Sequence, residues 1–335
     1  MKKTRFAFAG FRHGHILDLL TGVEERADAE VVACCEEDAA ARADLAAKGR
    51  VKITHTDYTA MLRDVECDVV AIGDYYAKRG AMVLAALNAG KHVLSDKPLC
   101  TTLAEQTEIE RLAAERHRVV GLQLDSRGYA PMRKLREIIR SGEIGDVATI
   151  HIEGEHPLNL GTRPGWYFED GKHGGTINDI GIHAFDFVPW LTGLAWREIS
   201  AARCWNAKPR EFPHFHGCAQ FMAVLENGAG VLADFSYLAP DTLGFKLPHY
   251  WHLMVHGTRG LAETHLMSAE VTVIKDTSTV PEQRPAGEAR TRGYLEDYLQ
   301  ELRGNKPEDL TSADSLRASR LALEAQLKAD RAAGG

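Results

Sequence analysis

Short apolar runs alternate with amphipathic stretches in the first third of the chain. Such runs are typical of buried strands, and apolar residues spaced three or four apart are typical of helices. Strands that alternate with helices predict a parallel sheet covered by helices. The expected strands lie at residues 4–9, 30–35, 69–72, 90–96 and 119–124, and the expected helices at 16–23, 38–48, 80–88 and 104–117.

The pattern changes near Ser126. A helix at 131–141 precedes several long strand-like runs with few helices between them, which indicates a mostly antiparallel sheet. We therefore predict an α/β chain with a doubly wound parallel sheet in residues 1–125. An α+β domain with a large, open, mostly antiparallel sheet follows in residues 126–335. The runs in this second part cover residues 147–155, 198–205, 218–225, 230–237, 251–256 and 270–276, and helices close the chain at 293–302 and 313–329.

Composition narrows the class of protein. The 335 residues are 44% hydrophobic and carry a net charge of −7, which argues against a nucleic-acid-binding surface. We find no apolar run of about 18 residues and no signal peptide, so no membrane segment is expected. The six cysteines lack C-x-x-C spacing and fit a reduced, cytoplasmic chain better than a disulfide framework.

Lys97 stands where the fourth strand of the parallel sheet ends, between Asp96 and Pro98. Open α/β sheets bind ligands at the carboxyl ends of their strands. Pro98 biases Lys97 toward an extended backbone, so its ammonium group is aimed rather than loose. The alternative is an ordinary surface turn.

The first strand leads into a turn that invites a dinucleotide-binding, or Rossmann, interpretation. Such a turn needs glycine, so that the backbone can come close to the pyrophosphate. It also needs a helix whose N-terminus lies beside the negative charge of the pyrophosphate. Here only Gly10 matches the usual glycine spacing, and Glu36 ends the second strand, where an acidic residue binds the ribose. Together with Glu37 and Asp38, Glu36 would repel the 2′-phosphate of NADP, so the sequence favours NAD over NADP. The candidate cofactor-binding residues are Gly10, Phe11, Arg12, His13, Gly14, Glu36, Asp74, Tyr75 and Lys97.

Asp179 and His183 lie four residues apart in a helix expected to end near Leu191, so they share one face, and Asp186 lies three further on the same side. A carboxylate beside an imidazole can orient a substrate hydroxyl and tune the base that deprotonates it. The structural alternative is an aspartate cap and a core histidine. We take Lys97, Asp179 and His183 as the catalytic candidates.

The second part is rich in histidine, and His214 and His216 would share one face of a strand. With Asp179 and His183 they form an alternative metal-binding set for Zn²⁺ or Mn²⁺. Trp166 is a candidate for stacking on a sugar ring, together with Asp179 and His183 as substrate-binding residues.

Segments 6–20, 89–99 and 174–186 together resemble the Gfo/Idh/MocA family of NAD(P)-dependent oxidoreductases, named for glucose–fructose oxidoreductase and inositol dehydrogenase. The resemblance implies that Lys97 contacts substrate and nicotinamide, and that Asp179 and His183 bind and deprotonate the substrate hydroxyl. It also implies a cis bond before Pro98 and homodimers or homotetramers built through the open sheet.

Several residues depart from the family pattern. Asp96 replaces a glutamate, and Arg79 replaces a frequent histidine. Arg12 and His15 stand where later fingerprint glycines are expected, and Asp74-Tyr75-Tyr76 replaces a turn of a small residue, proline and asparagine. A carboxylate at Asp74 beside a pyrophosphate would weaken binding unless Arg12 or Arg79 neutralises it.

We predict an NAD-dependent oxidoreductase that transfers a hydride at a secondary hydroxyl of a sugar, cyclitol or polyol. The alternative is a metal-dependent lyase, isomerase or hydrolase on the same fold. A catalytically silent binding protein is a third hypothesis, against which Lys97, Asp179 and His183 argue.

Overall fold

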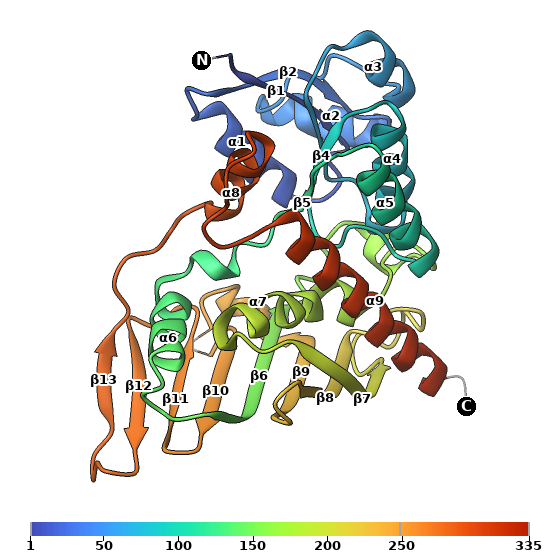
Figure 1. The fold of residues 1–335 in the computed structure, drawn as a ribbon. Helices are drawn as coiled ribbons and strands as arrows, with labels where there is room; N and C mark the ends of the chain where they lie inside the picture. Colours follow the sequence, from blue (N-terminus) through green and yellow to red (C-terminus); the bar gives the residue numbers. More distant parts are fainter. Residues whose placement is uncertain (1, 248, 334–335) are drawn as a thin grey trace.

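The computed structural model describes residues 2–247 and 249–333 and places two sheets one above the other (Figure 1). The first is a five-stranded parallel sheet in the order β2-β1-β3-β4-β5. Its strands are β1 (Thr4–Ala9), β2 (Ala29–Cys35), β3 (Val69–Ile72), β4 (His92–Ser95) and β5 (Val120–Leu122). The helices between them are α1 (His15–Glu24), α2 (Ala39–Lys48), α3 (Tyr58–Asp64), α4 (Tyr76–Asn88) and α5 (Leu103–Glu115).

The second sheet has eight strands in the order β13-β12-β11-β10-β6-β9-β8-β7. All neighbours are antiparallel except β6 and β9, which are parallel. The predicted fold class is therefore confirmed. The strands are β6 (Val147–Pro157), β7 (Trp196–Trp205), β8 (Cys218–Leu225), β9 (Gly230–Ala239), β10 (His252–Gly257), β11 (Gly260–His265), β12 (Glu270–Lys275) and β13 (Glu282–Pro285).

Among the described residues, helices cover one face of the second sheet. The helix α7 (Ile182–Thr192) lies between this sheet and the first one, and α6 (Ala130–Arg140) packs on β11 and β12 (Figure 1). Residues of β6 alternate accordingly: Ile150 and Ile152 are buried, whereas His151 and Glu153 are exposed. This alternation is typical of a sheet with one packed and one open face.

The last two helices, α8 (Gly293–Leu302) and α9 (Ser312–Ala333), return to the first sheet. In α9 the Ser312 hydroxyl oxygen accepts a hydrogen bond from the Val120 amide of β5 at 3.1 Å. At the other end of the helix, Gln326 Oε1 accepts one from the Ile177 amide at 3.0 Å. The division at residue 125 stays a prediction, since α9 packs against both sheets.

Local differences from the sequence-based elements bear on the site. Residues 177–181 form a π-helical turn ahead of α7, where we expected one continuous α-helix. His214 and His216 lie in an irregular segment and not in a strand, so the one-face argument for this pair was wrong. The elements α3, β11 and β13 were not predicted.

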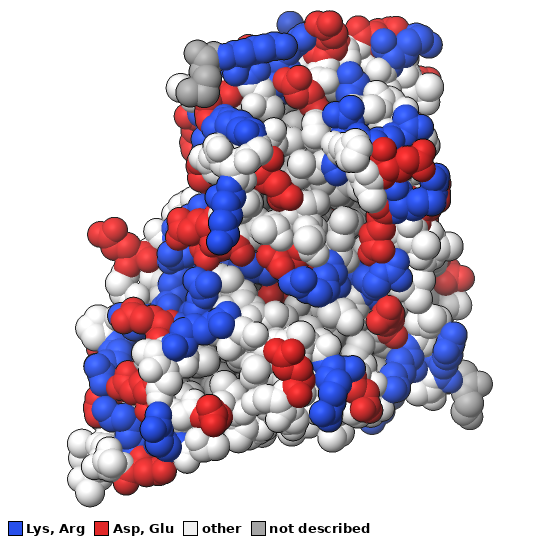
Figure 2. Space-filling view, in the orientation of Figure 1, with Lys and Arg blue, Asp and Glu red and all other residues white. Residues whose placement is uncertain are grey.

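Charge on the face drawn in Figure 2 is mixed, with Lys and Arg interspersed among Asp and Glu. Within residues 2–247 and 249–333, none of the helices has the length and apolar character needed to cross a membrane.

Candidate active site

Lys97 and Asp179 form a buried ion pair between the two sheets. Lys97 follows β4, and its Nζ lies 2.7 Å from Asp179 Oδ1 and 2.9 Å from the main-chain oxygen of the same residue. The two side chains are 5% and 2% exposed. The peptide bond between Lys97 and Pro98 is cis, as the family resemblance implied. The two sequence segments that contain Lys97 and Asp179 thus meet at one point.

The second carboxylate oxygen of Asp179, Oδ2, also has partners. The Tyr237 hydroxyl of β9 donates to Oδ2, and His173 Nε2 lies 3.5 Å from that atom. Burial opposes ionisation of Asp179, but the Lys97 ammonium and His173 outweigh it and hold the pKa of Asp179 well below its usual range. Asp179 is therefore a charged anchor for Lys97. The sequence indicated Tyr237 only as an aromatic residue that could stack on a sugar ring, and His173 not at all, because nothing local marks their approach to Asp179.

His183 lies on α7, one turn after Asp179. Its Nδ1 is 3.2 Å from the Ser126 hydroxyl, and its ring packs edge-on against Trp251 with centroids 5.1 Å apart. Burial, and then the nearby Lys97 ammonium, lower the pKa of His183 well below that of a free imidazole. His183 is therefore neutral near pH 7 and able to accept a proton.

Asp186 does not join this group. Its carboxylate pairs with Arg127, whose Nη2 lies 2.6 Å from Asp186 Oδ1. Arg127 adjoins Ser126, the residue that contacts His183, so Asp186 lies next to the cavity lining without being part of it.

Lys97, Asp179 and His183 line one cavity of about 480 Å³ between the two sheets. This volume lies within the range of small-molecule sites and suits a single sugar or cyclitol ring. Most of the residues that line it carry a polar group, which suits a substrate with several hydroxyls. Other residues of the lining include His13, His15, Gln123, Asp125, Ser126, His156, Arg163, Tyr167, Tyr237 and Trp251.

The turn after β1 fits the pyrophosphate of a dinucleotide. Gly10 has a φ of +77°, and a Cβ there would lie 2.5 Å from Asp74 Cβ, so only glycine is accommodated. Gly14 precedes α1 with no side-chain cap, and a Cβ there would meet nothing within 4 Å. The first amides of α1 are thus left for an anionic group.

Asp74 is neutralised within this turn. Arg12 Nε lies 2.6 Å from Asp74 Oδ1, and Lys78 Nζ lies 3.0 Å from Oδ2. Arg79 instead donates to the main-chain oxygen of Asp74 at 2.7 Å. The Arg12 guanidinium also stacks on the Tyr75 ring, 4.4 Å from its centroid. The unfavourable carboxylate expected at Asp74 is therefore compensated by Arg12, one of the two arginines considered.

Glu36 is fully buried at the end of β2. Its Oε2 accepts a hydrogen bond from the Phe11 amide at 2.6 Å, and its Oε1 accepts one from the Asp38 amide at 2.8 Å. Burial raises the pKa of Glu36. The Glu36 carboxylate thus connects the glycine turn to the start of α2. A ribose hydroxyl would have to bond to carboxylate oxygens that already accept main-chain hydrogen bonds.

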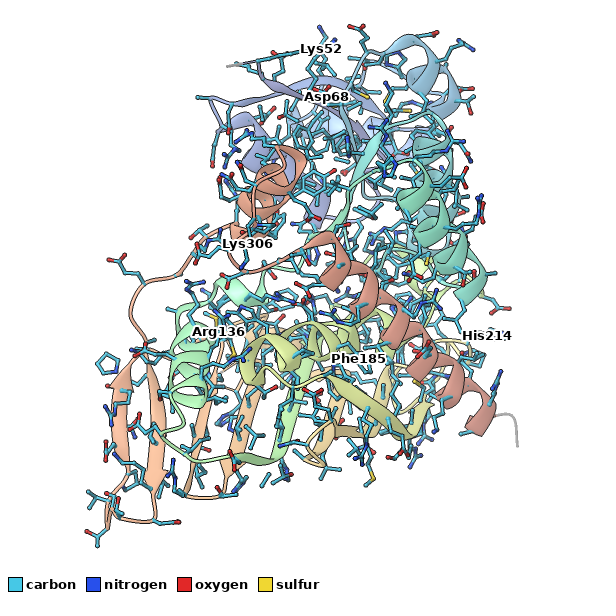
Figure 3. The ribbon with its side chains drawn as sticks, viewed as in Figure 1. Lys52, Asp68, Arg136, Phe185, His214 and Lys306 are labelled. Carbon is cyan, nitrogen blue, oxygen red and sulfur yellow. The ribbon has the colours of Figure 1, made fainter. Side chains whose placement is uncertain are left out.

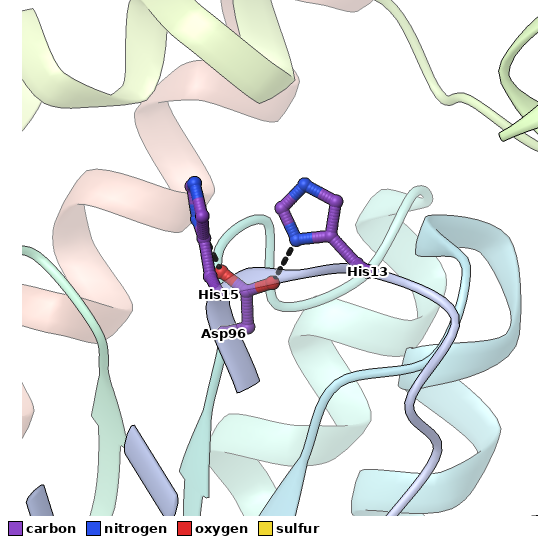
Figure 4. A group of neighbouring side chains, drawn as sticks. All are labelled: His13, His15 and Asp96. Atoms are coloured by element: carbon purple, nitrogen blue, oxygen red, sulfur yellow. Dashed lines mark hydrogen bonds and ion pairs between the residues drawn. The ribbon is translucent and has the colours of Figure 1, made fainter. Parts of the chain in front are cut away.

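Asp96 and Arg79 form a second buried ion pair, directly beside Lys97. Arg79 Nη2 lies 2.8 Å from Asp96 Oδ2, and both side chains are wholly buried. Arg79 Nη1 also donates to the main-chain oxygen of Lys97 at 2.5 Å. His13 and His15 flank the same carboxylate from the glycine turn (Figure 4). Asp96, Arg79 and His15 all depart from the family pattern, and the structure brings them together.

Other predicted residues lie outside the cavity. Trp166 is buried and donates from Nε1 to the main-chain oxygen of Arg12 at 3.1 Å, while its neighbour Tyr167 lines the cavity. His214 and His216 line a different cavity from Asp179 and His183, and His214 lies at the outer edge of the molecule (Figure 3). The alternative metal-binding set is therefore not assembled.

The fold and this site define an oxidoreductase with a nucleotide-binding Rossmann sheet. A model described as the oxidoreductase family with an NAD-binding Rossmann fold matches residues 5–124, and the Gfo/Idh/MocA C-terminal domain matches residues 132–263. The chain belongs to the Gfo/Idh/MocA family of oxidoreductases. The resemblance seen in the sequence is thereby confirmed.

Individual relatives are distant. An inositol 2-dehydrogenase of Paenarthrobacter aurescens is 26% identical over 92% of this chain and 90% of its own length. A bovine trans-1,2-dihydrobenzene-1,2-diol dehydrogenase is 26% identical, but the match covers only 50% of this chain and 49% of that enzyme. An oxidoreductase from Agrobacterium radiobacter in complex with NAD⁺, L-tartaric acid and magnesium superposes with a TM-score of 0.78 over 99% of this chain and 98% of its own, at 17% identity. This last likeness concerns the fold alone.

Proposed function

We propose that this enzyme oxidises a secondary hydroxyl of a sugar, cyclitol or related polyol, or reduces the corresponding ketone, with NAD as cosubstrate. The observation that carries the proposal is the shared cavity in which an anchored lysine and a neutral, buried histidine face one small-molecule space. The inositol dehydrogenase relative supports a polyhydroxylated substrate.

Lys97 polarises the reacting oxygen in this proposal. An ammonium group has three hydrogens to donate, and Asp179 accepts two of them through Oδ1 and its main-chain oxygen. One donor is left for the substrate oxygen, where it stabilises the charge that develops on an alkoxide. Asp179 thus positions Lys97, whereas the sequence suggested that it orients the substrate.

His183 takes the hydroxyl proton. Its Nδ1 is engaged by Ser126, which leaves Nε2 as the nitrogen for the substrate. Its lowered pKa keeps the ring neutral at the pH at which the proton must be accepted. In the reverse direction the protonated ring returns the proton to the ketone oxygen.

A nicotinamide dinucleotide, when bound, supplies the acceptor or donor of the hydride. Gly10, Phe11, Arg12, His13 and Gly14 would hold its pyrophosphate, with Asp74 and Tyr75 alongside and Glu36 bracing the turn. The acidic residues after β2 argue for NAD, because a 2′-phosphate would meet their charge.

We also propose that the chain works as a homodimer or homotetramer through the open face of the second sheet. This face carries an apolar hollow that includes Met222 and Leu232, which are 53% and 43% exposed. A cytoplasmic setting is part of the proposal, since all six cysteines are free thiols.

The test is a titration followed by an assay. Calorimetry with NAD and NADP on the purified chain should show tighter binding of NAD, and Glu36→Gln should narrow the difference. NADH formation should then appear with members of a panel of inositols and aldoses. If neither NAD nor NADP bound, the proposal would be contradicted. If both bound with equal affinity, the proposed preference for NAD would be wrong.

A further inference from the structure

His13, His15 and Asp96 form a compact cluster, of which only His13 has a place in the proposed function, in the turn assigned to the pyrophosphate. His15 Nδ1 lies 3.2 Å from Asp96 Oδ1, and His13 Nδ1 bonds to Oδ2 of the same carboxylate. Figure 4 shows one imidazole on each side of Asp96. Among the residues that the structure describes, this is the one group of three or more potential ligands whose donor atoms lie close together, all within 4.8 Å of one another.

The spacing of one donor pair is close to that of ligands around one metal ion. Zinc–nitrogen and zinc–oxygen bonds of about 2.0 to 2.2 Å place neighbouring ligands of a tetrahedral ion roughly 3.4 Å apart. His15 Nδ1 and Asp96 Oδ1 lie 3.2 Å apart, whereas His13 Nδ1 lies closer to Asp96 Oδ2, so His13 gives up this hydrogen bond and moves outward when the ion binds. Two imidazoles and one carboxylate suit zinc and its first-row neighbours, whereas magnesium and calcium prefer oxygen ligands alone.

The surroundings hold the cluster in place and leave it accessible. Arg79 bonds to Asp96 Oδ2, as carboxylate ligands of metals are commonly held by a further hydrogen bond. Its positive charge opposes a cation, and two further carboxyl groups, those of Asp18 and Asp125, line the same cavity. The His15 side chain is 49% exposed at this cavity and provides a path of entry.

We propose that His13, His15 and Asp96 bind one divalent transition-metal ion of the zinc class, with its remaining coordination positions open to the cavity. The ligand class that completes such a site is a hydroxyl or carbonyl oxygen of the substrate. The site goes beyond the proposed hydride transfer and does not depend on it, because metal binding is measured without nucleotide or turnover.

The experiment uses the full chain without a histidine tag, stripped of metal with a chelator and titrated with Zn²⁺ by calorimetry. The parent should bind one equivalent. His15→Ala should weaken binding by roughly tenfold or more, since it removes one of three protein ligands. His214→Ala is the matched control, because that histidine is exposed and lies outside the cluster, and it should bind like the parent.

A second measurement replaces Zn²⁺ with Co²⁺ and follows the visible absorption that nitrogen ligation produces. The band should be present in the parent and in His214→Ala, and lost in His15→Ala. A parent that binds no stoichiometric Zn²⁺ would overturn the proposal. Equal binding by the parent and His15→Ala would also overturn it, because the metal would then lie elsewhere. Neither result bears on NAD binding, so the two proposals fail separately.

Discussion

Arg79 and Asp96 are bonded to each other at 2.8 Å with no exposed surface on either side chain. Both residues depart from the family pattern, and the sequence offered no reason for either change. The structure supplies a reason for both changes. Arg79 on α4 is longer than the histidine it replaces, and Asp96 after β4 is shorter than the glutamate it replaces, so the two side chains still meet. The pair also fixes the backbone of Lys97 through the bond from Arg79 Nη1.

Removing one partner of the Arg79–Asp96 pair should destabilise the fold. Arg79→Met leaves the buried Asp96 carboxylate without its main partner, so we expect a loss of about 3 to 5 kcal/mol in the free energy of unfolding. The double variant Arg79→Met/Asp96→Asn removes both charges and should recover part of that loss. Urea unfolding of the three proteins measures this, and a single variant as stable as the parent would contradict the buried pair.

Lys97→Ala should lower both activity and stability. The rate should fall by roughly a hundredfold or more, because the donor to the reacting oxygen is lost. The unpaired Asp179 carboxylate should also destabilise the fold by about 3 kcal/mol. Lys97→Ala/Asp179→Asn should regain stability but not turnover. If the double variant regained turnover as well, Lys97 would have no catalytic role.

His183 should give the enzyme an acid limb at unusually low pH. A general base works only when unprotonated, so the rate falls as pH drops through its pKa. That pKa is lowered by burial and by Lys97, so kcat/KM should stay level where a free imidazole, with a pKa of about 6.5, would already be half protonated. The limb should vanish in His183→Asn together with most of the rate. A limb centred at the free imidazole value would contradict the buried site.

Glu155 should make the protein less stable as the solution becomes alkaline. Burial, followed by the charges of Asp234 and Glu153, raises the pKa of Glu155 to about 8. Between about pH 4.5 and 8 the unfolded chain gives up this proton while the folded chain keeps it, so stability falls as pH rises.

Glu155→Gln should remove this dependence. The variant should match the parent near pH 4.5 and exceed it by about 1 to 3 kcal/mol near pH 8. Glu270→Gln is the control, because Glu270 is exposed on β12 and is not among the charges that raise the pKa of Glu155. Thermal unfolding at both pH values measures the effect, and parallel curves for parent and Glu155→Gln would rule out the shifted carboxyl.

The elements that the sequence predicted well are those whose signal is local. The buried runs of β1, β3 and β8 have the predicted bounds, because continuous or alternating apolar residues need no distant partner to be recognised. In contrast, β13 spans Glu282–Pro285 and has no apolar residue, so only its pairing with β12 makes it a strand.

The site was predictable in part for the same reason. Lys97, Asp179 and His183 stand in segments with recognisable patterns, and the structure brings all of them to one cavity. The contact of Tyr237 with Asp179 spans 58 residues, and that of Arg79 with Asp96 depends on two elements meeting. Such partners belong to the tertiary fold, and no spacing in the sequence encodes them.

The helix α9 has a consequence for how the molecule moves. It is bonded to β5 through Ser312, to α5 through the ion pair of Arg320 with Glu110 at 2.6 Å, and to the turn that carries Asp179 through Gln326. Because α9 is bonded to both halves of the molecule, it opposes a rotation of one half relative to the other. Adjustment to substrates of different size must therefore come from short segments at the cavity rim, such as the one with exposed Leu243 and Phe245, while the distance between Lys97 and His183 stays constant.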